Sequence, residues 1–399
     1  MKDKFLLIFI LFIFSCNSDK KDILSLNTFP ENSSESFLLS TNDNLYISWT
    51  EQVADSNFLY LSKLENNTWS EKSIIKKGTD WFVNWADFPS ISYNDISSSI
   101  FSFHLQKSSE ETFSYDVNYH FNINDRWIDM KNIHDDNTFS EHGFVSSVPY
   151  KDGFMVSWLD GRNTYGKGHD GHAKGAMTIR SAILNSNGKI INQSLIDEMV
   201  CDCCQTSMTV SNDIPMVVYR DRSKDEIRDI YFSRYINSDW TEPQPIHDDG
   251  WEINGCPVNG PNVDSYKNNV VVSWFSASNG RPKVNLKFSS DNGRTFGDKI
   301  LIDDVENSPI GRVDVEFLNS KEVMISWLST VDGKGKLLMR KIGIDGEVGS
   351  IKVIDEVSTE RSTGFPQIEE FNDDVFISWT DNSQANKIVK VTKIPVSVL

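Results

Sequence analysis

The sequence has little positive charge for its size. It contains 39 lysine and arginine residues against 57 aspartate and glutamate residues, so its formal net charge is −18. Nonspecific binding to nucleic acid requires a cationic surface that neutralises phosphates, and we therefore expect no nucleic-acid partner. The acidic residues are spread along the chain rather than gathered in blocks, a pattern that favours solubility.

The apolar run near the N-terminus, residues 5–14, is too short to cross a bilayer as a permanent helix. It follows two lysines and ends at a small residue before Cys16, which is the order of a secretory signal. Ile13-Phe-Ser-Cys16 resembles the lipobox of bacterial lipoproteins, whose cysteine is diacylated. We therefore expect a signal peptide over residues 1–15, a lipid anchor on Cys16, a polar tether over residues 16–22 and a location in the cell envelope, at the outer membrane or cell surface. An ordinary cleaved signal with an incidental cysteine is the alternative.

The sequence also has few cysteines. Besides the lipobox residue there are four: Cys201, Cys203, Cys204 and Cys256. Disulfides persist in exported proteins, so an even number of cysteines indicates bridges. The alternative is a copper or zinc site built from these thiolates, with His169 or His172 of a glycine-rich segment as further ligands. The sequence leaves both roles open.

An apolar strand that ends in an aromatic residue recurs along the whole chain. Leu45-Tyr-Ile-Ser-Trp49, Val270-Val-Val-Ser-Trp274 and Val375-Phe-Ile-Ser-Trp379 are examples. The aromatic residues stand at positions 49, 103, 158, 219, 274, 327 and 379, so the period is 52 to 61 residues. A near-constant period of this size, rich in β-branched and aromatic residues, is typical of propeller blades. We predict an all-β, seven-bladed β-propeller; a six-bladed propeller is the alternative, because the second copy lacks its tryptophan.

Each period divides into four strands. A first strand precedes the recurring phrase, and a third strand and a turn rich in Asn, Asp and Gly follow it. The last copy has room for only three strands before the chain ends. We expect residues 23–28 to supply the missing strand and close the ring, so that no edge is left open. Residues 23–399 then form a single propeller domain, which we expect to be monomeric.

The segment Ser289-x-Asp291-x-Gly293-x-Thr295-Phe296 resembles the Asp-box, or BNR repeat, of sialidases and related propellers. The phrases Trp158-Leu-Asp-Gly-Arg162, Cys201-Asp-Cys-Cys-Gln-Thr206 and Tyr219-Arg-Asp-Arg222 resemble exported bacterial proteins of the sialidase-like kind. This resemblance implies a propeller that binds or hydrolyses an acidic glycan. The catalytic pattern of true sialidases is not matched, because Phe29-Pro-Glu-Asn-Ser33 lacks the first arginine of their substrate-binding triad.

In a propeller, the loops between blades and the loops between second and third strands share one face. Most of the chemically unusual residues fall in these loops, which predicts a pocket at the channel mouth. If the protein is a glycoside hydrolase, the candidate catalytic carboxylates are Asp160, Asp221, Asp229 and Asp314. The candidate substrate-binding residues are Arg162, Arg220, Arg222, Arg228, Arg312, Arg361 and Trp251.

Two alternatives stay open for these residues. The arginines Arg220, Arg222 and Arg228 are interspersed with acidic residues, so an internal salt-bridge network is as good an interpretation as anion binding. The protein as a whole is either a glycan-directed lipoprotein, with or without turnover, or an envelope metal-binding or redox protein that uses its cysteines.

Overall fold

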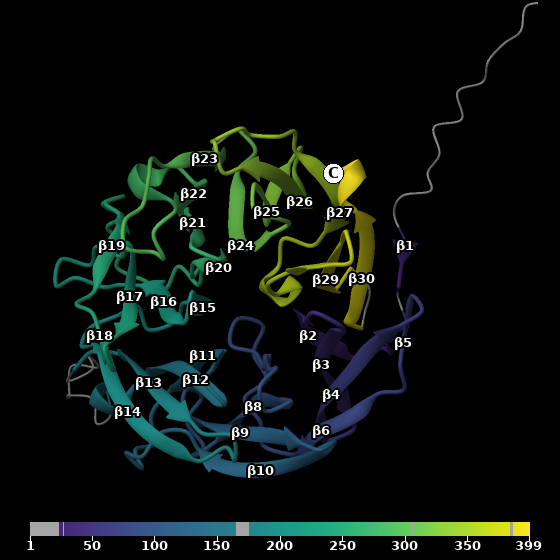
Figure 1. Cartoon of the computed structure of the whole chain (residues 1–399), viewed down its shortest axis with the longest axis vertical. Helices are drawn as coiled ribbons and strands as arrows, with labels where there is room; N and C mark the ends of the chain where they lie inside the picture. The colour runs from purple at the N-terminus through teal and green to yellow at the C-terminus, as the bar shows by residue number, and fades with distance from the viewer. Residues whose placement is uncertain (1–23, 27, 165–174, 305, 384–385) are drawn as a thin grey trace, which may run out of the picture.

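The computed structural model describes residues 24–26, 28–164, 175–304, 306–383 and 386–399. The expected signal peptide, Cys16 and the tether lie outside the described residues, as do His169 and His172. Seven antiparallel sheets stand in chain order around a central channel (Figure 1). The predicted all-β, seven-bladed propeller is confirmed, and the six-bladed alternative is wrong.

The first strand of each blade is the innermost and lines the channel. Blade 1 consists of β2 (Ser33–Ser40), β3 (Leu45–Val53), β4 (Ser56–Glu65), β5 (Thr68–Trp69) and β6 (Ser73–Gly78). Blade 2 consists of β7 (Ile91–Asn94), β8 (Ser99–Lys107), β9 (Tyr115–Ile123) and β10 (Arg126–Asn132). Blade 3 consists of β11 (His142–Tyr150), β12 (Gly153–Asp160), β13 (Thr178–Leu184) and β14 (Ile190–Asp197).

The next blades repeat the same order. Blade 4 consists of β15 (Ser207–Ser211), β16 (Ile214–Arg220), β17 (Ile230–Ile236), β18 (Asp239–Trp240) and β19 (Gln244–His247). Blade 5 consists of β20 (Asn262–Tyr266), β21 (Asn269–Ser276), β22 (Lys283–Ser289) and β23 (Ile300–Asp303). Blade 6 consists of β24 (Pro309–Phe317), β25 (Glu322–Val331), β26 (Lys334–Gly343) and β27 (Lys352–Val357).

Blade 7 joins the two ends of the chain. It consists of β28 (Gln367–Phe371), β29 (Asp374–Asp381), β30 (Ile388–Pro395) and β1 (Leu24–Ser25). Strand β1 pairs antiparallel with β30, with Leu24 opposite Lys393 and Ser25 opposite Thr392. The N-terminal strand therefore completes the last blade and leaves β30 paired on both sides, as expected from the sequence.

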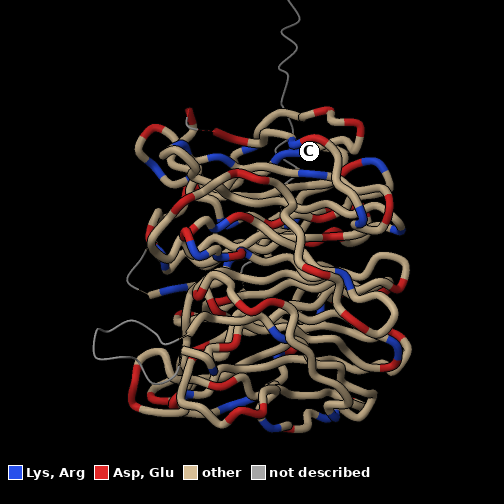
Figure 2. Tube along the Cα trace, turned by 90° about the vertical axis from the view of Figure 1, so that its left-hand side faces the viewer, with Lys and Arg blue, Asp and Glu red and all other residues tan. Residues whose placement is uncertain are grey.

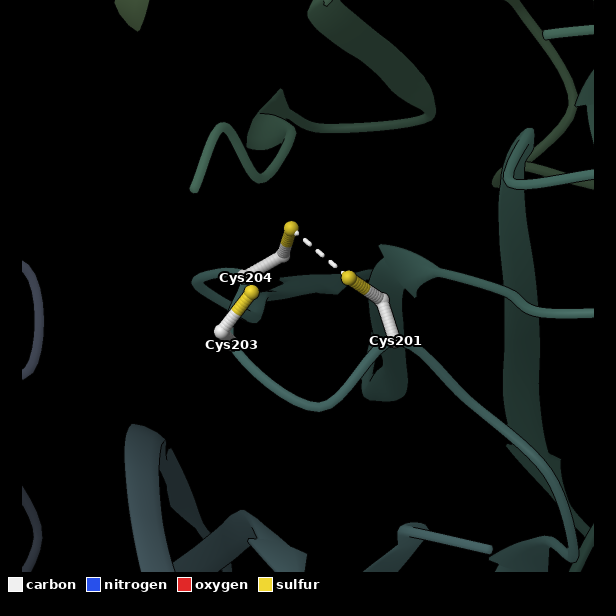
Figure 3. A group of neighbouring side chains, drawn as sticks. All are labelled: Cys201, Cys203 and Cys204. Atoms are coloured by element: carbon white, nitrogen blue, oxygen red, sulfur yellow. Dashed lines mark hydrogen bonds between the residues drawn. The ribbon is translucent and has the colours of Figure 1, made fainter. Parts of the chain in front are cut away.

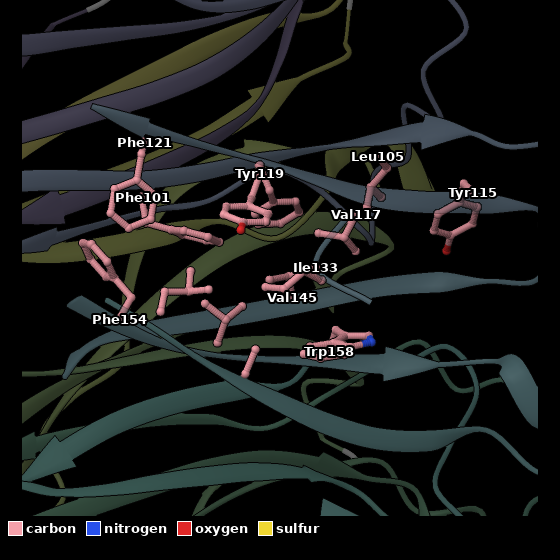
Figure 4. Close-up of a cluster of buried hydrophobic side chains, with 14 residues drawn as sticks. Phe101, Leu105, Tyr115, Val117, Tyr119, Phe121, Ile133, Val145, Phe154 and Trp158 are labelled. Atoms are coloured by element: carbon pink, nitrogen blue, oxygen red, sulfur yellow. The ribbon is translucent and has the colours of Figure 1, made fainter. Parts of the chain in front are cut away.

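The recurring aromatic residues fill the spaces between blades. Each lies on the second strand of its blade, and Trp158, Trp274 and Trp327 are fully buried. These strands read as nearly continuous apolar runs because a neighbouring blade covers each of their faces. In the second copy Phe103 replaces the tryptophan and belongs to the buried cluster between blades 2 and 3. Figure 4 shows Tyr119, Phe154 and Trp158 of the same cluster.

Buried carboxylates join the innermost strands of the later blades. Asp264 accepts the amide N–H of Phe317 at 2.7 Å, and Asp314 accepts the amide N–H of Ile368 at 2.7 Å. Glu369 accepts the amide N–H of Ser40 at 3.1 Å. Inner strands of adjacent blades form no ladder with one another, so these side chains satisfy amides that would otherwise lack a partner.

The turn over residues 289–296 joins β22 to β23, on the face away from the interblade loops. Asp291 accepts hydrogen bonds from the amide and hydroxyl of Thr295 at 2.9 and 2.7 Å. Gly293 has a φ of +70°, and a Cβ there would lie 2.6 Å from the Met216 sulfur. The left-handed backbone and the close approach both explain why glycine stands at this position.

The described residues have little helix. It is limited to short 3₁₀ turns: η1 (Arg162–Thr164), η2 (Ser278–Gly280), η3 (Arg361–Thr363) and η4 (Val396–Val398). Within the described ranges, none of these helices has the length and apolar character needed to cross a bilayer. Figure 2 shows that acidic and basic residues alternate over the molecule rather than gathering in one charged region.

Candidate functional site

The loops between blades and the loops between second and third strands meet on one face, which we call the mouth face. Isolated bridges connect the two kinds of loop, as between Val200 and Asp221 and between Ile227 and Glu252. The mouth loop, residues 79–90, connects blade 1 to blade 2 on this face. It reaches the loop between blades 6 and 7, because Trp85 stacks on Phe365, 5.9 Å between ring centroids.

Two cavities border the mouth loop. The central channel has a volume of about 480 Å³, and Asp87 and Phe88 of the mouth loop line it together with the seven inner strands. A groove of about 600 Å³ lies on the mouth face over blades 7, 1 and 2. Its lining includes Trp81 and Phe82 of the mouth loop, the basic residues Lys107 and Lys387, and the acidic residues Glu51 and Glu110. Aromatic residues beside charged groups of both signs suit a polar ligand.

Asp87, Tyr115 and Glu141 form a hydrogen-bonded cluster beside the mouth loop, which we call the Tyr115 cluster. The Tyr115 hydroxyl lies 2.9 Å from Asp87 Oδ2 and 2.7 Å from Glu141 Oε1. A hydroxyl has one hydrogen to donate. Both contacts are therefore hydrogen bonds only when one carboxyl is protonated and donates to the tyrosine oxygen.

Burial holds both carboxyl groups of this cluster near neutrality. It raises the pKa of Asp87 to about 7, against the lowering effect of hydrogen bonds from Phe144 N–H and Tyr115. Burial, with the nearby charges of Asp87 and Asp202, raises the pKa of Glu141 to about 8. Two carboxyl groups that keep a proton near neutral pH are suited to acid–base chemistry. Glu141 is the partly exposed member, whereas Asp87 and Tyr115 are buried.

Arg312 is the buried cation nearest the mouth loop. Its guanidinium lies 4.8 Å from the centroid of Trp85 and donates to the carbonyl oxygens of Gly364 and Glu360 at 3.1 and 3.2 Å. Burial and the charge of Arg361 lower its pKa to about 10. No described carboxylate forms an ion pair with Arg312 or with the exposed Arg361. An anion would therefore find uncompensated positive charge here.

Strained backbone places three side chains at the rim of the channel. Glu35, Phe144 and Arg312 have φ angles of 48°, 52° and 57°. Each lies where the first strand of its blade shifts register against the second strand. Bulges of this kind change the direction of side chains beside functional sites. Here they affect Glu35, Phe144 and Arg312, each near the mouth-face end of an inner strand.

The other predicted arginines are used in internal contacts. Arg220 donates to the carbonyl oxygens of Asn259 and Phe275 and stacks on Trp251 at 4.8 Å. Arg222 pairs with Glu226 at 2.6 Å and Asp202 at 3.1 Å, Arg228 pairs with Glu226 at 2.8 Å, and Arg162 pairs with Asp160 at 2.7 Å. Trp251 itself is buried. For these residues the structure favours the internal network over direct ligand binding.

The four predicted catalytic carboxylates do not meet in one site, although Asp221 and Asp229 are neighbours, with the Asp221 N–H donating to the Asp229 carbonyl oxygen at 2.9 Å. Asp160 is held by Arg162 and by the indole of Trp158, and Asp229 accepts the amides of Gly250 and Trp251. Asp314 belongs to the inner-strand contacts of the channel wall. Two of the four have a raised pKa: burial and the charge of Asp197 raise the pKa of Asp221 to about 7, and burial raises the pKa of Asp314 to about 7.

The cysteines divide into a bonded pair and a thiol pair. Figure 3 shows Cys203 beside the two thiols, Cys201 and Cys204. Cys203 is joined to Cys256, the disulfide alternative, which removes two of the four thiols from the predicted metal site. The Cys201 and Cys204 sulfurs lie 3.0 Å apart, and Arg228 donates to Cys201 Sγ at 3.3 Å. Burial by itself raises the pKa of Cys201, but the Cys204 thiol, a backbone N–H and the nearby guanidiniums lower it to about 6.

Sequence reasoning missed the Tyr115 cluster and a pair of histidines beside it. Tyr115 is the first residue of β9 and Glu141 directly precedes β11, and neither residue belongs to a recognisable motif. The available signal for Asp87 was its place in the tryptophan-bearing mouth loop. The histidines are His134 and His142, which stand eight residues apart in and beside the loop between blades 2 and 3.

Comparison with known proteins supports the fold. No family model matches the sequence, and a search of curated proteins finds no match. A solved structure of a protein of unknown function from Dyadobacter fermentans aligns with a TM-score of 0.51 at 11% identity, over 77% of this chain and 94% of that chain. The phage phi92 endosialidase aligns with a TM-score of 0.51 at 9% identity, over 94% of this chain and 69% of that chain. These similarities show a shared propeller fold of the sialidase-like kind.

Proposed function

We propose that this protein is an envelope lipoprotein whose mouth face binds or hydrolyses acidic glycans. The observation that carries the proposal is the mouth loop. Within a few residues it presents aromatic rings to the groove, stacks Trp85 on Arg312, and places Asp87 in the Tyr115 cluster. Aromatic rings, uncompensated guanidinium charge and proton-holding carboxyl groups are the components that an acidic-glycan site needs.

The Tyr115 cluster would supply the chemistry of a glycoside hydrolase. Glycosidic cleavage needs one group that donates a proton and a second that acts as nucleophile or base. Glu141, whose pKa is about 8, keeps its proton at neutral pH and is the partly exposed member, so it is the candidate acid. Tyr115, bonded to both carboxyl groups, is the candidate nucleophile, with the ionised form of Asp87 receiving its proton.

The arginines at the rim would hold the acidic group of the sugar. Arg361 is exposed and affects the pKa of the buried Arg312, so the two guanidiniums lie close enough for their charges to repel. A carboxylate or sulfate between them would relieve that repulsion and accept paired hydrogen bonds. The same surface explains why a neutral glycan should bind less well than an acidic one. The phage phi92 protein of similar fold is named an endosialidase, which makes sialosides the first class to test.

The test separates turnover from binding. Purified protein is assayed with fluorogenic sialosides, uronic acid glycosides and sulfated glycans, and binding is measured by calorimetry. Tyr115→Phe should abolish turnover and leave binding of the glycan intact. Tyr119→Phe is the matched control, because Tyr119 lies on the same strand and donates to the Gly188 carbonyl, away from the cluster. Arg361→Ala should weaken acidic-glycan binding about tenfold or more, whereas Arg281→Ala, another exposed arginine of the mouth face, should not.

The results divide the proposal cleanly. Turnover that Tyr115→Phe removes makes the protein a glycoside hydrolase, and binding without turnover makes it a glycan-binding propeller. Binding that Arg361→Ala and Arg281→Ala affect equally would reject the rim as the anion site. Absence of both binding and turnover across the three glycan classes would reject the proposed function.

A second candidate function rests on the thiol pair. The short distance between the Cys201 and Cys204 sulfurs and the contact with Arg228 are the features of a redox-active Cys-x-x-Cys pair. Copper or zinc bound by these two thiols is the metal version of the same candidate. Thiol titration and elemental analysis of protein from an envelope fraction test this candidate. If Cys201 and Cys204 are always bonded to each other and no metal is present, the candidate is rejected.

A further inference from the structure

Two histidines and three aspartates meet between blades 2 and 3 on the mouth face. Asp116 lies on β9, His134 in the loop after β10, and His142 at the start of β11. Asp116 Oδ1 lies 3.4 Å from His134 Nε2 and 3.8 Å from His142 Nδ1. These three atoms lie within 4.8 Å of one another, a grouping that could hold a metal ion.

The same three atoms make no well-aligned hydrogen bond, although, against the lowering effect of burial, the ion pairs with Asp116 and Asp136 raise the pKa of His134 to about 9. Asp116 Oδ1, His134 Nε2 and His142 Nδ1 are all buried and without a hydrogen bond within the described residues. The side chain of His142 is 0% exposed and that of His134 is 1% exposed. Buried polar atoms without a partner are costly and rare in native proteins. Three of them within 4.8 Å of one another indicate a ligand that satisfies all three together.

The surrounding groups orient the two rings as an outer shell does around a metal. On the side away from Asp116, His134 Nδ1 and His142 Nε2 face Asp136 Oδ1 at 2.9 and 3.2 Å. Asn132 donates to the second oxygen of Asp116 at 2.9 Å. A metal-bound histidine characteristically directs its other nitrogen at a carboxylate, and a metal-bound carboxylate accepts a further hydrogen bond.

The repeat provides an internal comparison. His134-Asp-Asp136 recurs as His247-Asp-Asp249 at the end of the outer strand of blade 4. There Asp249 accepts the indole N–H of Trp274 at 2.6 Å, and in the next blade Asp303 accepts that of Trp327 at 2.7 Å.

Between blades 2 and 3 this contact is different. The indole of Trp158 donates to Asp160 instead, at 2.9 Å, which frees Asp136 to face the two histidines. Of these three tryptophans, Trp158 is the one that does not bond to the aspartate after the preceding outer strand, and His142 lies where it can complete a site with His134.

We propose that Asp116, His134 and His142 bind a divalent transition metal, Zn²⁺ by ligand preference, with one coordination position open. Zinc bonds to nitrogen and oxygen of about 2.0–2.2 Å at tetrahedral angles place ligand atoms roughly 3.3–3.6 Å apart, close to the distances between Asp116 and the two rings. Two imidazoles and one carboxylate are a donor set that zinc and non-haem iron both accept.

The site requires one local movement. The two rings are parallel, with 1° between their planes and 3.7 Å between centroids. Both nitrogens can point at one ion only when a ring turns about its side-chain bonds. A second group, Asp136, His142 and Asp160, is excluded as the metal site because Arg162 already neutralises it, at 2.7 Å from Asp160 and 3.5 Å from Asp136.

Metal at this position would also fix the Tyr115 cluster. Asp116 follows Tyr115 and His142 follows Glu141, and a parallel bridge links Tyr115 to Glu141. Adjacent residues on a strand point to opposite sides, so the ion and the Tyr115 cluster lie on the two sides of the same pair of segments. The metal proposal does not depend on the glycan proposal, and its test uses no glycan.

The test measures zinc on purified protein that has been stripped with a chelator and dialysed. Calorimetric titration and elemental analysis should give one zinc per chain in addition to any held by thiols. The thiol contribution is removed in a Cys201→Ser, Cys204→Ser variant, which should keep the site. His142→Ala should lose it, and Asp136→Asn should weaken it about 10- to 100-fold. His247→Ala is the matched control from the repeat and should bind as wild type does.

Two measurements on wild-type protein test the proposal even if a variant fails to fold: Co²⁺ spectroscopy and crystallography. Co²⁺ bound to wild-type protein should give ligand-field bands without a sulfur charge-transfer band, and zinc-soaked crystals should show an anomalous peak between Asp116 and the two histidines. Zinc stoichiometry equal in wild type and His142→Ala would overturn the proposal. So would the absence of the anomalous peak.

Discussion

Asp314 provides a quantitative test of how the channel wall is built. Its carboxyl group is buried and accepts the amides of Val315 and Ile368, at 3.1 and 2.7 Å. Burial raises its pKa from 3.8 to about 7. The folded state therefore holds this proton more tightly than the unfolded state does. The stabilisation from the bound proton is present at low pH and is lost as the pH rises towards 7.

The size of the effect follows from the shift. One pKa unit corresponds to about 1.4 kcal/mol. About two pH units separate pH 5 from the pKa of about 7 at which the folded protein loses this proton. Raising the pH from 5 to 8 should therefore reduce the contribution of Asp314 to the free energy of unfolding by about 3 kcal/mol. Asp314→Asn cannot ionise and should not show this loss. The amide also changes one backbone hydrogen bond, but that offset is the same at both pH values and cancels in the comparison.

Urea unfolding at pH 5 and pH 8, followed by tryptophan fluorescence and circular dichroism, measures the difference. Asp298→Asn is the matched control because Asp298 is exposed. The reasoning is refuted if wild type and Asp314→Asn lose the same stability between the two pH values. Asp314→Asn should also leave any glycan turnover intact, in contrast to the sequence-based assignment of this residue as catalytic.

Two further predictions concern the cysteines. Cys256→Ser opens a loop of 53 residues and should lower the free energy of unfolding by about 4 kcal/mol through the entropy of the unfolded chain; urea unfolding measures it, and an unchanged midpoint would mean that the disulfide does not form in the mature protein. Cys16→Ala should move the protein from the membrane to the soluble fraction of cells, because it removes the proposed lipid attachment point; fractionation and immunoblotting measure it, and continued membrane retention would contradict the lipid anchor.

The fold was accessible from the sequence because its signal repeats. Seven aromatic residues at nearly equal spacing each reappear on the second strand of a blade, and the short last copy predicted the closing strand β1. A repeat seen in seven copies is recognisable even when one copy departs from it. The presence of Phe103 in place of a tryptophan therefore did not hide the pattern. Burial of Phe103 in the same position shows why the blade tolerates the exchange.

The site was less accessible because contacts across the mouth are not periodic. Sequence reasoning selected Arg220 and Asp229 for their charge, but Arg220 donates to backbone carbonyls and Asp229 accepts backbone amides. Charge alone therefore does not distinguish a residue that binds a ligand from one that satisfies backbone groups of its own loops. The partners of Tyr115 come from positions 28 residues before it and 26 after it, a pairing that only the ring geometry creates.

The central claim is that the mouth face acts on acidic glycans through the Tyr115 cluster, and one comparison tests it most directly. Wild type, Tyr115→Phe and Tyr119→Phe are assayed side by side with the best acidic glycan from the screen, over pH 5 to 9. The account predicts turnover in wild type and Tyr119→Phe that falls as Glu141 loses its proton near pH 8, and none in Tyr115→Phe. Equal turnover in Tyr115→Phe and Tyr119→Phe would contradict it.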